Sequence, residues 1–102
     1  MKNQMRAIHP GEILKEEYLV PLGLSVNALA KALHVTPSRI NDIVLGRRGV
    51  TPDTALRLAR YFGGDAQSWL NLQQSYDLKV AEQSMLKTIL KTVMPMGSVA
   101  LA

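Results

Sequence analysis

Two apolar helical patterns that are separated by only three residues constrain this fold more than any other feature. The first pattern places apolar residues at positions i, i+3, i+4 and i+7, on one face of a helix: Val26, Leu29, Ala30 and Leu33. A second short helix begins with Thr36 as its N-cap and Pro37 at its first position, and Gly46 ends it. Two helices joined this closely must cross, so the sequence predicts a helix-turn-helix over about residues 25–46.

The residues of this unit meet the physical demands of a helix-turn-helix. Ala30 is small enough to let the two helices approach closely, and His34 tolerates the positive φ that the turn requires. Ile40 and Ile43 fall on the inner side of the second helix, where they anchor it to the core. The outer side of that helix carries polar residues, so it is free to contact a ligand.

The rest of the chain also reads as helices joined by short turns. Their apolar spacing and caps predict helices from Gly11 to Leu19, from Thr51-Pro52 to Gly63, from the N-cap Asp65 onward and around residues 86–93. We expect the first of these helices to stop before Pro21. No stretch alternates apolar and polar residues convincingly, so we predict an all-α fold without a sheet.

The length of 102 residues suits a single compact domain. We place this domain over residues 1–82. A C-terminal helical extension and a mobile tail are expected over residues 83–102, because Pro95 and Gly97 break the last apolar helical pattern.

The excess positive charge of the chain is confined to its middle third. Residues 1–24 and residues 63–102 each carry three basic and three acidic side chains. Residues 25–62 carry six basic side chains against two acidic ones, and this difference accounts for the whole formal net charge of +4. A basic patch around the helix-turn-helix favours a polyanion partner, while a solvated charged face would give the same totals.

The exposed side of the second helix carries residue types that read DNA bases. Arg39 can pair with guanine and Asn41 with adenine. Asp42 can accept from a cytosine amino group, or it can hold Arg39 or Arg47 in place. Ser38 lies in the first turn, which points toward base edges in such complexes. We therefore predict Ser38, Arg39, Asn41 and Asp42 as base-reading residues.

A second group of residues is placed to contact the DNA backbone. Arg47 and Arg48 follow the second helix, where phosphates would run, so they are suited to positioning the protein. Ser25, Asn27 and Thr51 lie near the starts of helices, where hydroxyl, amide and N–H groups can hold phosphate oxygens. Ser25 and Thr51 serve equally well as plain helix caps, and for these two we favour capping.

Several classes of protein are excluded by what the sequence lacks. The chain has no cysteine, which excludes disulfides, thiolate metal sites and a cysteine nucleophile. Its two histidines, His9 and His34, have no metal-ligand spacing, and Glu16-Glu17 point about 100° apart on a helix. We therefore expect no catalytic residue, no metal and no cofactor.

No apolar run is long enough to span a bilayer and the N-terminus has no signal-peptide core, so we expect a soluble, cytoplasmic protein without membrane contact.

The chain resembles the HigA antitoxins, a branch of the Cro/C1 repressor-like helix-turn-helix proteins. The resemblance covers roughly residues 7–82, and it rests on AIHPGEILKEEYL, on the helix-turn-helix and on SWLNLQQSYDL. It implies a five-helix, lambda-repressor-like bundle, usually dimeric, that represses its own operon and neutralises a partner toxin, HigB, a ribosome-dependent mRNA endonuclease. Carried over by position, it implies base-reading roles for Ser38, Arg39 and Asn41, and backbone contacts for Thr36, Arg47 and Arg48.

Two other functions stay open at this point. A stand-alone transcriptional regulator without a toxin has the same sequence features, and a neighbouring reading frame for a short, basic, RelE-like protein would distinguish the two. A helical interaction module that binds no DNA would use the apolar residues after Asp65 and those of residues 86–93. We predict a homodimer, because two recognition helices related by a two-fold axis would read half-sites about 34 Å apart. We place the seam on these residues, because their apolar faces exceed what five short helices can bury.

Overall fold

The structure is a computed structural model, and it describes residues 6–97. Its helical elements follow one another with short joints: α1 (Pro10–Leu14), the π-helical segment η2 (Lys15–Leu19), α2 (Val20–Leu22), α3 (Val26–Leu33), α4 (Pro37–Val44), α5 (Pro52–Phe62) and α6 (Ala66–Thr92). Because α1, η2 and α2 run on without a break, these elements make five helices, and residues 6–97 contain no strand. This arrangement confirms the predicted all-α fold.

The helix-turn-helix is formed as predicted, with α3 and α4 as its two helices. Side-chain oxygens cap the helices that follow the first one: Ser25 for α3, Thr36 for α4, Thr51 for α5 and Asp65 for α6. Each accepts a hydrogen bond from the backbone N–H three residues along the chain, and a cap of this kind contributes about 1 kcal/mol. The left-handed conformation expected of His34 is present, with φ 59°, and Gly46 after α4 has φ 77°.

The first helix is longer than the sequence predicts. The expected stop before Pro21 is wrong, because the helix continues to Leu22 and ends at Gly23, which has φ 61°. A proline inside an α-helix lacks an N–H donor, and its ring collides with the carbonyl four residues earlier. Here η2 precedes the proline, with the Val20 N–H donating to the Lys15 carbonyl. This wider π-helical turn relieves the collision, so the helix continues past Pro21 instead of ending there.

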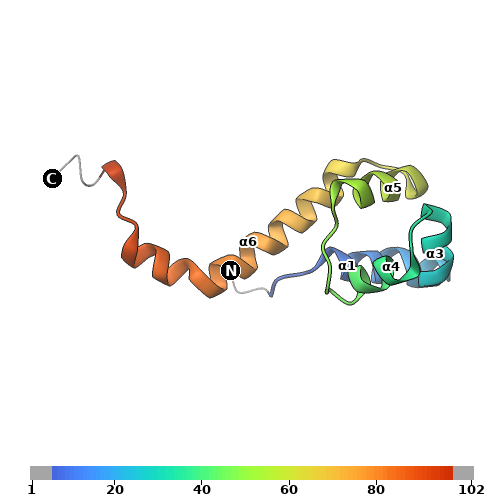
Figure 1. The fold of residues 1–102 in the computed structure, drawn as a ribbon, viewed down its shortest axis with the longest axis horizontal. Helices are drawn as coiled ribbons and strands as arrows, with labels where there is room; N and C mark the ends of the chain where they lie inside the picture. The colour runs from blue at the N-terminus through green and yellow to red at the C-terminus, as the bar shows by residue number, and fades with distance from the viewer. Residues whose placement is uncertain (1–5, 98–102) are drawn as a thin grey trace.

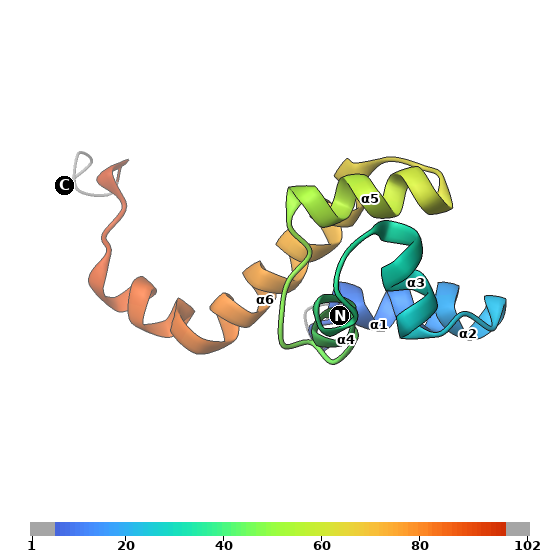
Figure 2. The same ribbon diagram turned by 45° about the vertical axis from the view of Figure 1, so that its right-hand side comes forward.

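The hydrophobic core lies between the first helix, α3, α4 and α5, and the start of α6 closes it (Figure 2). Ile40 and Ile43 on α4 are fully buried, as predicted for the inner side of the second helix. Ala30 on α3 is also fully buried, and its small size permits the close contact between α3 and α4. Trp69 is buried against Tyr18, with ring centroids 5.4 Å apart. Only one face of α4 is therefore buried in the core.

Helix α6 packs on the bundle through its first half, and its second half projects away from it (Figure 1). The helix has 27 residues and is about 40 Å long at 1.5 Å per residue, in a molecule 60 Å long. Every described side chain from residue 82 onward is exposed. Four large apolar side chains of this half lie on one side of the helix and are called the α6 row below: Met85, Leu86, Ile89 and Leu90.

The second half of α6 is the C-terminal helical extension that the sequence predicts. The predicted division of the chain at residue 82 falls inside α6, which is continuous there, and that division stays a prediction. The predicted mobile tail at residues 98–102 lies outside the described residues. Over the described part of the chain, no helix is both long and apolar enough to cross a membrane.

His9 caps the first helix. Its Nδ1 accepts a hydrogen bond from the Gly11 N–H at 2.9 Å, and its buried ring meets the Tyr76 ring edge-on, with centroids 4.8 Å apart. Burial lowers the pKa of His9, and the carboxylates of Asp77 and Glu12 offset part of that effect. The ring therefore stays neutral at pH values where an exposed histidine is partly protonated.

We expect the free energy of unfolding to fall as the pH is lowered from about 7.5 through the ordinary histidine pKa of about 6.5 to about 5.5. Because the folded state lowers the pKa of His9, the unfolded chain binds more protons in this window, and acid favours unfolding. Urea denaturation at both ends of the window measures the change. The matched variant His9→Asn keeps a capping oxygen but has no imidazole, so its stability should change less. An equal change in both proteins would contradict the assignment to His9.

Candidate nucleic-acid interface

The outer face of α4 is open to solvent at its N-terminal half. Ser38 and Asn41 are exposed there. The Asn41 side chain makes no hydrogen bond within residues 6–97, and the Ser38 hydroxyl contacts the Thr36 hydroxyl at 3.4 Å. The N-terminus of α4, which carries a partial positive charge, lies beside them. This part of α4 can therefore exchange hydrogen bonds with a ligand.

Arg39 lies on α4 but is tied to the neighbouring helix. Its Nη1 donates to Oδ2 of Asp53, in the first turn of α5, at 2.7 Å. The Arg39 side chain is 31% exposed and that of Asp53 is 55% exposed, so the pair lies at the surface. The sequence suggested Arg39 or Arg47 as the partner of Asp42. Arg39 pairs with Asp53 instead, because the fold brings the start of α5 alongside α4.

Asp42 faces the loop that follows α4. Its carboxylate oxygens lie 4.0 Å from Nη1 of Arg47 and 3.8 Å from Nη2 of Arg48. Its backbone carbonyl accepts hydrogen bonds from the N–H groups of both arginines, at 2.8 and 3.2 Å. Exposed ion pairs contribute only about 0–1 kcal/mol, so the backbone bonds are what shape this loop. The two guanidinium groups remain available, with side chains 67% and 50% exposed.

The structure brings together only some of the residues that the sequence suggests for the DNA backbone. Arg48 and Thr51 line one surface pocket together with Arg39. Ser25 lines a different pocket, at the start of α3, and Asn27 is exposed in the first turn of that helix. The hydroxyls of Ser25 and Thr51 both cap helices, which confirms the role favoured for them.

Asp53 and Arg57 belong to the same surface as Arg39, although the sequence did not predict either of them as a residue of the DNA interface. Both line the pocket that contains Arg39. Arg57 Nε donates to Asp53 Oδ2 at 3.0 Å, and the guanidinium groups of Arg57 and Arg39 hold the pKa of Asp53 below its usual value. The four-residue spacing of Asp53 and Arg57 on one helix is a sequence signal for their pairing. Their connection to Arg39 joins two helices and has no such signal.

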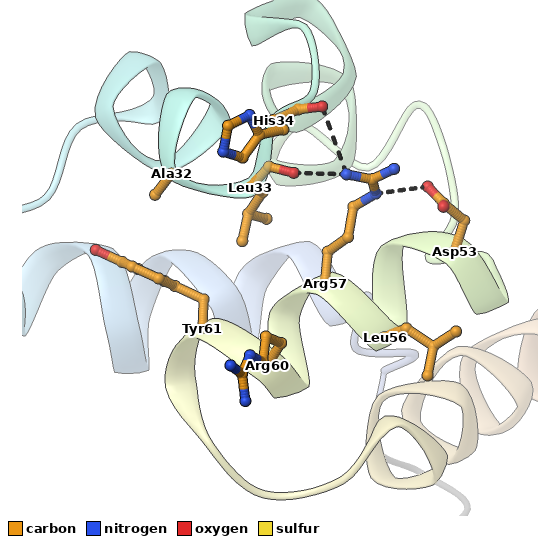
Figure 3. A pocket seen from close by; sticks show the side chains of 8 residues that line it. All are labelled: Ala32, Leu33, His34, Asp53, Leu56, Arg57, Arg60 and Tyr61. Atoms are coloured by element: carbon orange, nitrogen blue, oxygen red, sulfur yellow. Dashed lines mark hydrogen bonds and ion pairs between the residues drawn. The ribbon is translucent and has the colours of Figure 1, made fainter.

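Arg57 also reaches the turn of the helix-turn-helix. Figure 3 shows its side chain extending from α5 toward the end of α3. Its Nη1 donates to the Leu33 carbonyl at 2.8 Å and to the His34 carbonyl at 3.5 Å. The last carbonyls of a helix have no partner within the helix and carry partial negative charge, which suits a guanidinium. These bonds attach α5 to the turn.

The surface around α4 therefore carries more positive than negative charge. Four arginines and two aspartates form two connected groups there: Arg39, Arg57 and Asp53 in one, and Arg47, Arg48 and Asp42 in the other. An excess of guanidinium groups beside an open helix face suits a polyanion such as a nucleic-acid backbone. Within residues 6–97 there is no group of three or more His, Cys, Asp or Glu side chains that could hold a metal ion.

Comparisons with known sequences place the chain among helix-turn-helix proteins. The helix-turn-helix family HTH_3 matches residues 14–69. Virulence-associated protein I of Dichelobacter nodosus is 67% identical over 97 residues, which make up 95% of this chain and 88% of that protein. The uncharacterized HTH-type transcriptional regulator YbaQ of Escherichia coli K12 is 42% identical over 76 residues, which make up 74% of this chain and 67% of that protein.

Solved structures point to one branch of this family. The structure of the Pseudomonas aeruginosa antitoxin HigA with the higBA promoter matches with a TM-score of 0.87 and 46% sequence identity. The match covers 89% of this chain and 99% of that one. A family of regulators and antitoxins is not a family of enzymes, which agrees with the prediction that the chain has no catalytic residue. The chain belongs to the HigA-type branch of the Cro/C1 repressor-like helix-turn-helix family.

Proposed function

We propose that this chain is an antitoxin that binds operator DNA in the cytoplasm, represses its own operon and neutralises a HigB/RelE-like mRNA endonuclease. The observation that carries the proposal is the open polar face of α4, which lies beside a basic surface on a fold shared with a HigA antitoxin solved with promoter DNA. The arginines of that surface supply the positive charge that phosphate binding requires. The toxin partner is inferred from the same antitoxin relative.

In this proposal α4 enters the major groove with its N-terminal half. Arg39 pairs with a guanine and Asn41 with an adenine, while Ser38 and Asp42 add contacts to neighbouring bases. A second set of residues contacts the sugar–phosphate backbone and positions α4: Thr36, Arg47, Arg48, Asn27, Ser25 and Thr51. The capping hydroxyls of this set take part through their helix N-termini, whose N–H groups can face phosphates.

Replacing Arg47 with alanine should weaken binding to operator and random DNA by the same factor. Its side chain is 67% exposed and its guanidinium lies 4.0 Å from the Asp42 carboxylate, so this loose ion pair leaves it accessible to a phosphate. Loss of one phosphate contact should flatten the slope of log affinity against log salt by about 0.9. Fluorescence anisotropy titrations at several salt concentrations measure both quantities. A loss confined to operator DNA, or an unchanged slope, would exclude the backbone role.

We also propose that the protein is a homodimer whose two chains pair through the α6 row. A helical segment without tertiary contacts is marginal in water, and a contiguous exposed apolar surface is typical of an interaction site. In the first half of α6, Trp69 is buried in the core and the Tyr76 ring contacts His9, so this half packs against the bundle. The proposed seam is therefore limited to the projecting half of α6, which leaves α4 of each chain free to read one half-site.

The double variant Leu86→Glu/Leu90→Glu should sediment as a monomer at micromolar concentration, because two carboxylates on the α6 row oppose burial of that row. Ser84→Glu/Thr88→Glu is the matched control, since it adds the same charge at the same spacing on another side of α6. Analytical ultracentrifugation of both variants and the wild type measures the oligomeric state. A monomeric wild type, or a dimeric Leu86→Glu/Leu90→Glu protein, would reject the seam.

The proposed function is tested by titrating DNA from immediately upstream of the gene for this chain, with random-sequence duplex as competitor, at two salt concentrations. Binding that survives an excess of competitor supports an autoregulating, operator-binding protein. Weak binding that is equal for both DNAs contradicts operator binding, and it favours the helical interaction module. The two salt concentrations separate phosphate attraction from base contacts, because only the former falls steeply with salt.

A second candidate function is that of a stand-alone transcriptional regulator, which the identity with the E. coli HTH-type regulator favours. Both candidates predict operator binding, so DNA titration does not separate them. Expression of the reading frame next to the gene, with and without this chain, does. If the product of the neighbouring reading frame arrests growth and this chain relieves the arrest, the antitoxin function is supported. If that product does not affect growth, the stand-alone regulator is supported.

A further inference from the structure

A continuous series of hydrogen bonds runs from the turn of the helix-turn-helix to Arg39. It starts at the carbonyls of Leu33 and His34, which accept from Arg57 Nη1 (Figure 3). Arg57 Nε then donates to Oδ2 of Asp53, and Arg39 Nη1 donates to the same oxygen. The series connects α3, α5 and α4 in that order.

Asp53 is the central member of this series. One of its carboxylate oxygens receives Arg39 at 2.7 Å and Arg57 at 3.0 Å. The far end of Arg57 is bonded to backbone carbonyls at the end of α3, which move only if the turn itself moves. The position of the carboxylate is therefore defined by the backbone of the helix-turn-helix, and the carboxylate in turn defines where the Arg39 guanidinium lies. Without it, an arginine side chain has many accessible rotamers.

Stability does not account for this arrangement. The Asp53 side chain is 55% exposed, and ion pairs between exposed groups contribute little to folding because solvent screens them. A carboxylate beside the open face of α4 also repels phosphates, so it weakens attraction to DNA of every sequence. A residue that lowers general attraction and orients a base-reading side chain is suited to discriminating between sequences.

We propose that Asp53 is a positioning residue for sequence recognition that acts through Arg39. The inference rests on the proposed function of operator binding. Asp53 holds the Arg39 guanidinium in one orientation before DNA arrives, so a correctly placed guanine meets an ordered bidentate donor. The same ion pair keeps the Arg39 side chain from turning toward phosphates on DNA of any other sequence. Asp53 thus increases the ratio of specific to random binding.

The test uses full-length protein and a duplex that the wild type selects from a random-sequence pool, compared with unselected duplex. Asp53→Ala should bind unselected duplex a few-fold more tightly and the selected duplex more weakly, so the ratio of the two affinities falls about tenfold. Glu16→Ala is the matched control, because it removes the same charge from an exposed side chain on η2, whereas the Arg39 guanidinium is bonded to Asp53 on α5. Its ratio should equal that of the wild type. If Asp53→Ala does not fold, Asp53→Asn removes the charge while retaining side-chain shape, and its ratio should change in the same direction.

A double variant separates positioning from a structural role. If Asp53 acts through Arg39, the Arg39→Ala/Asp53→Ala protein should show the same affinity ratio as Arg39→Ala alone. Independent, additive losses would overturn the inference, as would an Asp53→Ala protein whose ratio matches the wild type. A wild type that enriches no sequence from the pool would overturn the proposed operator binding and this inference with it. Enrichment by the wild type without coupling between Asp53 and Arg39 overturns the inference alone.

Discussion

We expect Gly11→Ala to lower the free energy of unfolding by about 3 kcal/mol. A Cβ atom on Gly11 would overlap the carbonyl oxygen of Ile43 and would lie 2.7 Å from its carbonyl carbon. Both atoms belong to the backbone of α4, which cannot rotate aside as a flexible side chain can. Alanine is favoured over glycine inside a helix by about 1 kcal/mol, which is less than the cost of separating α1 from α4. The net effect is therefore destabilising.

Urea denaturation of Gly11→Ala and the wild type measures this difference. Gly97→Ala is the matched control, because nothing lies within 4 Å of a Cβ added there, so its stability should equal that of the wild type. Operator binding by Gly11→Ala should also weaken, since α4 must shift to admit the methyl group. A Gly11→Ala protein as stable as the wild type would contradict the direct backbone contact between α1 and α4.

The second large effect is expected for Arg39→Ala, which should lose roughly 1–3 kcal/mol of binding to operator DNA because a bidentate base contact is removed. Binding to random DNA should fall much less. The variant should remain folded, since the pair with Asp53 is exposed and solvent screens its contribution to stability. Anisotropy titrations on operator and random duplex, together with thermal melting, measure the three quantities.

Arg39→Lys is the control that separates charge from geometry. Lysine keeps the positive charge but has no planar fork of donors, so it cannot replace a bidentate contact with guanine. We expect its affinity for random DNA to match the wild type and its affinity for operator DNA to fall nearly as far as that of Arg39→Ala. Equal losses of Arg39→Ala on operator and random DNA would instead make Arg39 a phosphate contact.

Much of the fold could be predicted from the sequence because its signals are local. Thr36 and Asp65 were recognisable as N-caps because a side-chain oxygen needs only a backbone N–H three residues away. His34 in the turn followed from the spacing of the two apolar patterns, and it has the left-handed conformation. Pro21 shows where local reasoning failed. Its effect on the helix depends on the π-helical turn before it, and neither periodicity nor capping residues indicate such a turn.

The candidate interface was predictable in part for the same reason. The helical period alone separates the buried Ile40 and Ile43 from the exposed Ser38 and Asn41, so the choice of face on α4 needed no structure. The partner of Arg39 was not predictable. Asp42 on the same helix was the nearest carboxylate in the sequence. The fold instead places Asp53, on α5, against Arg39, on α4.

The sequence by itself determined the helices from α3 to α5, their caps, the turn and the outward face of α4, because periodicity, capping and φ preference act within a few residues. Only the tertiary structure decided that Asp53 holds Arg39, that Gly11 meets the backbone of α4, and that the second half of α6 stands clear of the bundle. Those features depend on how whole helices pack against one another. Packing brings together residues that are distant in the chain, and no local pattern records which of them will meet.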